Sequence, residues 1–221
     1  MLDNRVTAGT HDTLCTIKNK KLTKQSANQV ILKEETFNLV DFDFTNKELT
    51  KPQDFGITPK RIASFCWRGY ITTYKVDSDS NFILNKLMVY VDTNDEIKLV
   101  NNVAPISSKT KSQKRIIPRV YEEINLPLNY SGFILLTKDF IEEFYLQIGL
   151  HRAWKYKTVY EIEIDKGLVK SIIDLSRKGS EIRDSFQKSK GTTKKNNPPT
   201  EKEISKWLEN SFNQKYQKKK K

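Results

Sequence analysis

The chain has 221 residues, of which 37% are hydrophobic and 30% charged, a length and balance that can form one domain with a substantial core. No apolar run approaches the roughly 18 residues of a membrane-spanning helix, and the N-terminus has no apolar signal segment, so we expect neither a membrane span nor secretion. The two distant cysteines, Cys15 and Cys66, make no disulfide framework, which indicates a reducing, cytoplasmic location.

The net charge of +12 is concentrated at the C-terminus. Residues 186–221 contain eleven lysines and three glutamates, a balance of +8, which leaves +4 for residues 1–185. An electrostatic argument for an anionic partner therefore applies to the tail and not to the body of the chain.

Alternation of apolar and polar residues predicts a mostly antiparallel sheet within one domain, residues 12–185, after a disordered segment 1–11. Residues 45–60 are a predicted loop because they contain two prolines and a glycine, and residues 101–115 because they are polar, basic and poor in pattern. The predicted strands are 13–18, 28–44, 61–76, 81–92, 96–100, 131–137 and a hairpin 157–175 that turns at Asp165-Lys166-Gly167.

One helix is predicted between the strands. Residues 138–149 form an apolar face at helical spacing, made of Phe140, Ile141, Phe144, Tyr145 and Ile148. We expect this face to pack against the sheet.

The last part of the chain is predicted to be a linker, residues 186–199, followed by a helix, residues 200–221. Thr200 and Glu203 form a capping box after two prolines, and the apolar stripe ends in a lysine-rich tail. The predicted fold is therefore α+β, a mostly antiparallel β-sheet with one packed helix plus a C-terminal amphipathic helix.

The stretch SFCWRGY, residues 64–70, poses the main functional question. In an extended strand over residues 61–76, Trp67 points into the core, and Arg68 shares the opposite face with tyrosines. That face either binds an anion or a flat ring, or Arg68 pairs with a carboxylate on the neighbouring strand. The C-terminal helix likewise either enters a partner's groove or folds onto its own body. The predicted partner-binding residues are Arg68, Tyr70, Tyr74, Trp207, Leu208 and Phe212.

Catalytic signals in the sequence are weak. The chain has no G-x-S-x-G motif and no phosphate-binding glycine loop, and its histidines and cysteines lack metal-site spacing. We therefore predict no metal and no cofactor. An enzyme with a general base at His151, near Arg152 and Glu161, is the least favoured of three functions.

Two blocks, SFCWRGYITTYKV and FYLQIGLHRAWKYKTVYEIEIDKGLV, resemble a family of small uncharacterised bacterial proteins. The family pattern has a Trp-Arg-x-Tyr strand and, later, a Gly-containing aromatic stretch before a Tyr-Glu hairpin. The resemblance covers about half the chain and implies a cytosolic bacterial protein without a known activity. The matching residues are Trp67, Arg68, Tyr70, Gly149, Tyr160, Glu161 and Gly167.

These observations favour a non-enzymatic binding or adaptor protein that acts within a bacterial protein complex. The alternative is a nucleic-acid-binding protein that uses a basic loop, residues 107–119, together with the lysine-rich tail. The cations of that alternative are Lys109, Lys111, Lys114, Arg115, Arg119, Lys218 and Lys219.

Overall fold

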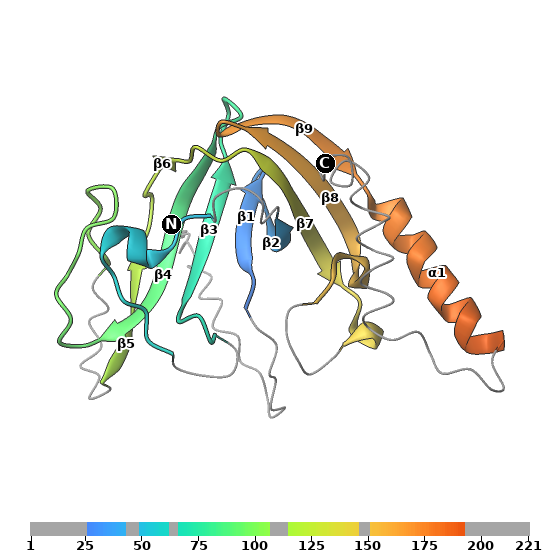
Figure 1. The fold of residues 1–221 in the computed structure, drawn as a ribbon, viewed down its shortest axis with the longest axis horizontal. Coiled ribbons are helices and arrows are strands. Elements are labelled where there is room, and N and C mark those ends of the chain that lie inside the picture. The colour runs from blue at the N-terminus through green and yellow to red at the C-terminus, as the bar shows by residue number, and fades with distance from the viewer. Residues whose placement is uncertain (1–25, 43–48, 62–65, 107–114, 146–150, 193–221) are drawn as a thin grey trace, which may run out of the picture.

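The computed structural model describes residues 26–42, 49–61, 66–106, 115–145 and 151–192 (Figure 1). These residues form one bent sheet in the order β5-β4-β3-β1-β2-β7-β8-β9, with β6 beside β4. All described pairings are antiparallel except β1–β3, which is parallel. The strands are β1 Asn28–Leu32, β2 Glu35–Phe42, β3 Tyr70–Val76, β4 Phe82–Asp92, β5 Ile116–Tyr121, β6 Leu126–Pro127, β7 Gly132–Phe140, β8 Tyr156–Asp165 and β9 Leu168–Asp174. The helices are the short 3-10 turns η1 Pro52–Phe55, η2 Glu142–Phe144 and η3 Ala153–Lys155, and the α-helix α1 Ser176–Thr192.

Two tight hairpins each have a two-residue turn. The β1–β2 turn holds Lys33 and Glu34 at positive φ, and the β8–β9 turn does the same with Lys166 and Gly167. Positive φ at both central positions matches the right-handed twist of the flanking strands. The β3–β4 and β8–β9 hairpins agree with the sequence prediction, but the β1–β2 turn falls inside residues 28–44, which are predicted as one strand.

The sheet bends until its two halves meet at one end. Asn81, before β4, forms a bridge with Leu168 of β9, and the amide of Phe82 donates to the carbonyl of Gly167 at 2.7 Å. In Figure 1 the strands converge at this end and spread apart at the other. The bend gives the sheet a concave face, on which the larger hydrophobic core is built.

Each face of the sheet has its own apolar cluster. The concave cluster includes Val30, Tyr74 and Leu136, and it also takes in Leu49 and Val100 from the loops before β3 and after β4. The cluster on the opposite face is smaller. It joins Val159 of β8 to η3 and α1 through Ala153, Trp154 and Ile182.

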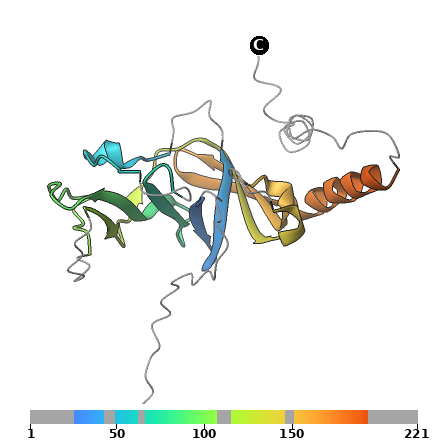
Figure 2. The same cartoon turned by 90° about the horizontal axis from the view of Figure 1, so that it is seen from below.

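Helix α1 is fixed mainly by a small residue and an arginine. A Cβ at Gly179 would lie 3.6 Å from Val159, so the helix backbone comes close to β8 there. Arg183 donates to the carbonyls of Trp154 and Tyr156, at 2.8 Å each. Figure 2 shows the rest of the helix leading away from the sheet. The fold is thus mostly β with one α-helix in the described part, which agrees with the α+β class.

Several segment predictions are wrong. Residues 138–140 continue β7, because Phe140 pairs with Tyr156 of β8, and only a 3-10 turn follows at Glu142–Phe144; residues 146–150 lie outside the described residues. The predicted linker is helical as far as Thr192. Residues 96–100 form no strand, although Val100 bridges Val103.

Strand β5, Ile116–Tyr121, begins within the segment predicted as a basic loop, residues 107–119. Proline lacks an amide donor, so within a strand it is accommodated where its nitrogen faces away from the paired strand. The carbonyl of Val120 faces away from β4, because it accepts from the amide of Ile106. Pro118, two residues earlier, faces the same outer side, so its missing donor costs no ladder hydrogen bond. The predicted segments 1–11, 13–18 and 200–221 lie outside the described residues.

Candidate functional site

A tight turn, and not a strand, carries the central residues of the SFCWRGY stretch. The amide of Gly69 donates to the carbonyl of Cys66 at 3.1 Å, and β3 begins only at Tyr70. Gly69 has φ +75°, and a Cβ on it would lie 2.4 Å from the carbonyl oxygen of Lys60. Its carbonyl accepts from Tyr90 of β4 at 2.8 Å. The turn is therefore fixed on both sides, and only glycine fits its last position.

The prediction that Trp67 points inward is wrong: the residue is 58% exposed. Residues 67 and 68 occupy the two central positions of the turn, where the alternation of a strand does not apply. Both side chains are therefore directed outward, and neither is packed in the core. An indole exposed in this way offers a large, rigid apolar face to a partner.

Two arginines stack on aromatic rings at this turn. The guanidinium of Arg61 lies 5.7 Å from the ring centre of Trp67, and that of Arg68 lies 5.3 Å from the ring centre of Tyr70. Arg68 also donates to the carbonyl of Ser26 at 2.9 Å, so its described hydrogen bond goes to the backbone and not to a carboxylate. We call these four residues, Arg61, Trp67, Arg68 and Tyr70, the Trp67 surface.

Tyr70 joins the Trp67 surface to the core. Its side chain is half-buried, and burial raises the pKa of its hydroxyl. The Arg68 guanidinium acts to lower this pKa, and the Asp54 carboxylate acts to raise it.

Tyr74, predicted to share the binding face, is fully buried in the concave core and stacks on Phe82 with ring centres 5.2 Å apart. Tyr74 is therefore a core residue, because the sheet bends over this face.

Replacing Tyr74 with phenylalanine is expected to cost no stability near pH 7, and to raise it by up to about 1 kcal/mol, because the buried hydroxyl makes no well-formed hydrogen bond with any described residue. Burial raises the pKa of Tyr74 far above that of an exposed tyrosine. The pKa of Tyr74 is about 10 in the unfolded chain and higher in the fold. Ionisation therefore leaves the stability of the wild type unchanged below about pH 10 and lowers it progressively as pH rises towards the folded pKa. The advantage of the variant should therefore grow by up to about 1.4 kcal/mol per pH unit above about pH 10. Urea unfolding at neutral and alkaline pH measures it, and an equal difference at both would contradict the prediction.

The residues of the enzyme hypothesis are dispersed. His151 is buried against Phe140, with ring centres 4.5 Å apart, and Arg152 is exposed. Glu161 pairs with Leu135, five residues along β7 from Phe140, which corresponds to about 17 Å at the usual strand rise. Glu161 also shares its face of β8 with Val159, which packs toward η3 and α1, so it faces away from His151. The described residues do not bring an acid and a base together there.

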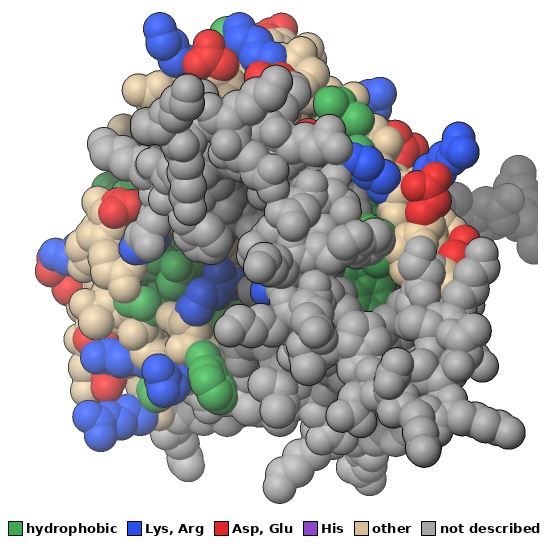
Figure 3. All heavy atoms as spheres, turned by 45° about the vertical axis from the view of Figure 1, so that its right-hand side comes forward, with side chains coloured by type: hydrophobic (Ala, Val, Ile, Leu, Met, Phe, Trp, Pro, Cys, Tyr) green, Lys and Arg blue, Asp and Glu red, His purple; other side chains and the backbone are tan. Residues whose placement is uncertain are grey.

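The cations of the nucleic-acid hypothesis do not form one surface in the described part. Arg115 is exposed and pairs with Asp92 at 3.1 Å. Arg119 is 7% exposed and donates to the carbonyls of Asp95 and Glu96, so it belongs to the interior and not to an exposed basic patch. On the face in Figure 3, basic and acidic side chains are interspersed. The predicted residues outside the described ranges are Lys109, Lys111, Lys114, Lys218, Lys219, Trp207, Leu208 and Phe212.

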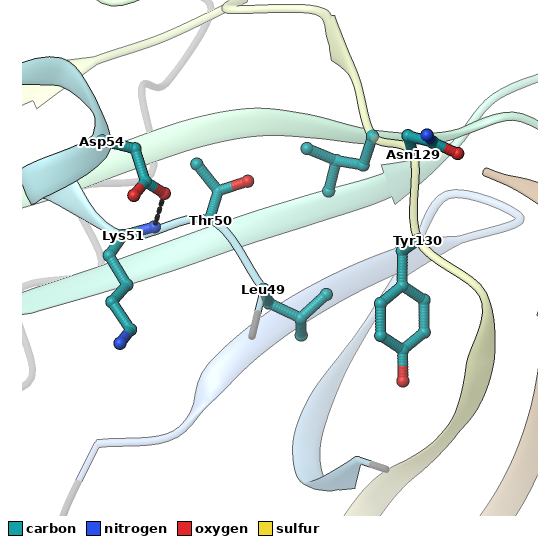
Figure 4. A pocket seen from close by; sticks show the side chains of 7 residues that line it. Leu49, Thr50, Lys51, Asp54, Asn129 and Tyr130 are labelled. Carbon is teal, nitrogen blue, oxygen red and sulfur yellow. Dashed lines mark hydrogen bonds between the residues drawn. The ribbon is translucent and has the colours of Figure 1, made fainter. Parts of the chain in front are cut away.

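The sequence prediction misses three features of the surface. The first is the turn before β3: residues 61–69 are predicted to belong to a strand, whereas β3 begins at Tyr70. Gly69 is the residue that signals this interruption. The loop after β4 exposes Ile97 and Leu99, which alternation assigns to a strand, and Ile106, which lies in a predicted loop. A pocket of about 430 Å³ also lies between residues 49–54 and 128–130 (Figure 4).

Within the described residues, no helix is long and apolar enough to cross a membrane. Among the same residues, His, Cys, Asp and Glu side chains form no group of three that could hold a metal ion. Comparison of the chain with protein-family models, curated proteins and solved structures finds no match. The family resemblance therefore stays a prediction, and function has to be inferred from the chemistry of the surfaces.

Proposed function

We propose that this protein is a non-enzymatic binding protein that recognises a partner protein through the Trp67 surface. The observation that carries the proposal is an exposed tryptophan, held on a fixed turn, with an arginine stacked on its ring. Tryptophan, tyrosine and arginine are the residues in which binding energy at protein interfaces concentrates. A turn that is fixed before binding also loses little conformational entropy when the complex forms.

The chemistry of the Trp67 surface defines the partner. Two guanidinium groups, on Arg61 and Arg68, can each hold a carboxylate, and the indole offers a wide apolar face. The partner segment is therefore expected to carry aspartate or glutamate beside an aromatic or large apolar residue. Recognition of this kind requires neither a cofactor nor a bond-breaking step.

Selection from a random peptide library on the full-length protein tests this function. Peptides with an acidic residue next to an aromatic one should be enriched. Binding of the best peptide should fall at least roughly tenfold in Trp67→Ala, because truncation of a hot-spot residue costs about 2 kcal/mol. Arg68→Lys should weaken binding less than Arg68→Ala, since lysine keeps the charge but loses the planar stacking. The exposed Lys157 of β8 provides the control, and Lys157→Ala should bind like the wild type.

Two results would count against this function. Equal binding by the wild type and Trp67→Ala would show that the selected peptides use another surface. An exposed indole beside arginines also suits stacking on nucleic-acid bases. If a single-stranded oligonucleotide bound through Trp67, with affinity falling steeply as salt rises, the nucleic-acid alternative would replace the proposal.

A further inference from the structure

The pocket beside η1 has two walls that are fixed independently. One wall is residues 49–54, where Asp54 accepts from the backbone amide of Lys51 at 2.8 Å and so caps the 3-10 turn. The other wall is residues 128–130, where the amide of Leu128 donates to Phe82 and the carbonyl of Tyr130 accepts from Gly167. The second wall is thus bonded to the sheet, and the first is held against it by Leu49, which packs in the concave core, so the space between them exists without a ligand.

The lining of the pocket is amphipathic. Leu49, Leu128 and the ring of Tyr130 supply apolar surface. In Figure 4, Leu49 and Thr50 point toward the segment that carries Asn129 and Tyr130. The side chains of Thr50 and Asn129 make no hydrogen bond within the part of the chain that the structure describes. Asn129 points away from residues 49–54 in Figure 4, so of these two side chains it is Thr50 that can serve a ligand in this pocket, whose volume is typical of small-molecule sites.

The charges of the lining have opposite signs. Lys51 supplies an ammonium group and Asp54 a carboxylate. The Lys51 amide bonds to Oδ2 of Asp54, which leaves Oδ1 to accept from a ligand. A strongly anionic ligand such as a phosphate would meet the Asp54 carboxylate as well as the ammonium group, so the balance disfavours it.

We propose that this pocket binds a small zwitterion of the amino-acid type with an apolar side chain. The ligand ammonium lies at Asp54, its carboxylate lies at Lys51 and Thr50, and its side chain lies against Leu49 and Leu128. The inference goes beyond the proposed protein-binding function, because the lining does not include the Trp67 surface.

Calorimetric titration of the full-length protein with leucine tests the proposal. Two matched ligands each lack one charge: 4-methylpentanoate has no ammonium group, and 3-methylbutylamine has no carboxylate. Leucine should bind at least roughly threefold more tightly than either, because each one-charge ligand loses one ion pair with a partly exposed side chain.

The variants distinguish recognition of charge from damage to the fold. Asp54→Asn keeps an oxygen acceptor for the Lys51 amide but removes the charge. It should weaken binding of leucine and of 3-methylbutylamine, and leave binding of the anionic 4-methylpentanoate equal or stronger, because a like charge is removed. Thr50→Val, which keeps the shape of the side chain, should weaken binding of leucine and of 4-methylpentanoate. Arg68→Ala, at the other surface, should change none of the three affinities.

Three outcomes would overturn the inference. The first is no saturable binding of leucine at millimolar concentration. The second is equal affinity for leucine and for either one-charge ligand. The third is an equal loss of affinity for all three ligands in the Asp54→Asn variant. None of these outcomes bears on the Trp67 surface, which is tested with peptides.

Discussion

Replacing Gly167 with alanine is expected to lower the free energy of unfolding by at least about 3 kcal/mol, because two unfavourable terms add. Gly167 has φ +82°, a conformation that costs an L-residue about 1–2 kcal/mol. The added Cβ would also lie 2.1 Å from the backbone carbonyl oxygen of Leu128, which cannot move as a flexible side chain can. The backbone of Gly167 bonds to both Tyr130 and Phe82, so any shift opens the junction between the two halves of the sheet.

Gly56 provides a matched control for this substitution. It also has positive φ, +69°, but a Cβ built there meets nothing within 4 Å. Gly56→Ala should therefore cost only about 1–2 kcal/mol, the conformational term alone. Urea unfolding of both variants gives the difference. Equal losses would show that the close approach at Leu128 contributes nothing.

The second large effect is expected at Arg119. Its guanidinium is buried and donates to the carbonyls of Asp95 and Glu96. These hydrogen bonds hold the loop after β4 over the concave face. Arg119→Met keeps much of the apolar stem but leaves these carbonyls without their donors. We expect a loss of about 3 kcal/mol, since each hydrogen bond to a charged group contributes about 1.5–3 kcal/mol. Hydrogen exchange should show lost protection in residues 93–106 before any other part of the described chain.

Arg115, four residues earlier, provides the control for charge alone. It forms an ion pair with Asp92, but its side chain is 89% exposed. Exposed ion pairs contribute little, so Arg115→Met should change stability by less than about 1 kcal/mol. If Arg115→Met and Arg119→Met destabilised the protein equally, lost charge and not the buried hydrogen bonds would be the cause.

The local elements of this fold were predictable because their signals lie within a few residues of one another. Alternation in residues 70–76, 82–92 and 157–174 identifies the strands of the β3–β4 and β8–β9 hairpins, whereas residues 28–44 are predicted as one strand and in fact contain the β1–β2 turn. Lys166-Gly167 marks a two-residue turn because glycine tolerates the positive φ that such a turn needs. Backbone sterics and side-chain alternation are properties of the local chain, so no knowledge of distant residues was required.

Burial and exposure at the candidate sites could not be predicted in the same way. Trp67 is exposed because it lies in a turn and β3 begins only at Tyr70. The turn depends on Gly69, whose backbone lies against the carbonyl of Lys60, so strand alternation does not apply to residues 67 and 68. Arg119 is buried because the loop carbonyls 23 and 24 residues away supply its acceptors. Phe140 continues a strand, despite its helical spacing, because β8 pairs with it.

The sequence by itself determined the β3–β4 and β8–β9 hairpins and the turn at Lys166-Gly167, since steric preferences and short-range periodicity act within each segment. Only the tertiary structure decided that β1 runs parallel to β3, that Tyr74 lies in the core, and that two loop segments enclose a pocket. Those features depend on contacts between residues far apart in the chain. The free energy of such contacts comes from burial and from completing hydrogen bonds across the sheet, and neither quantity exists until the distant segments meet.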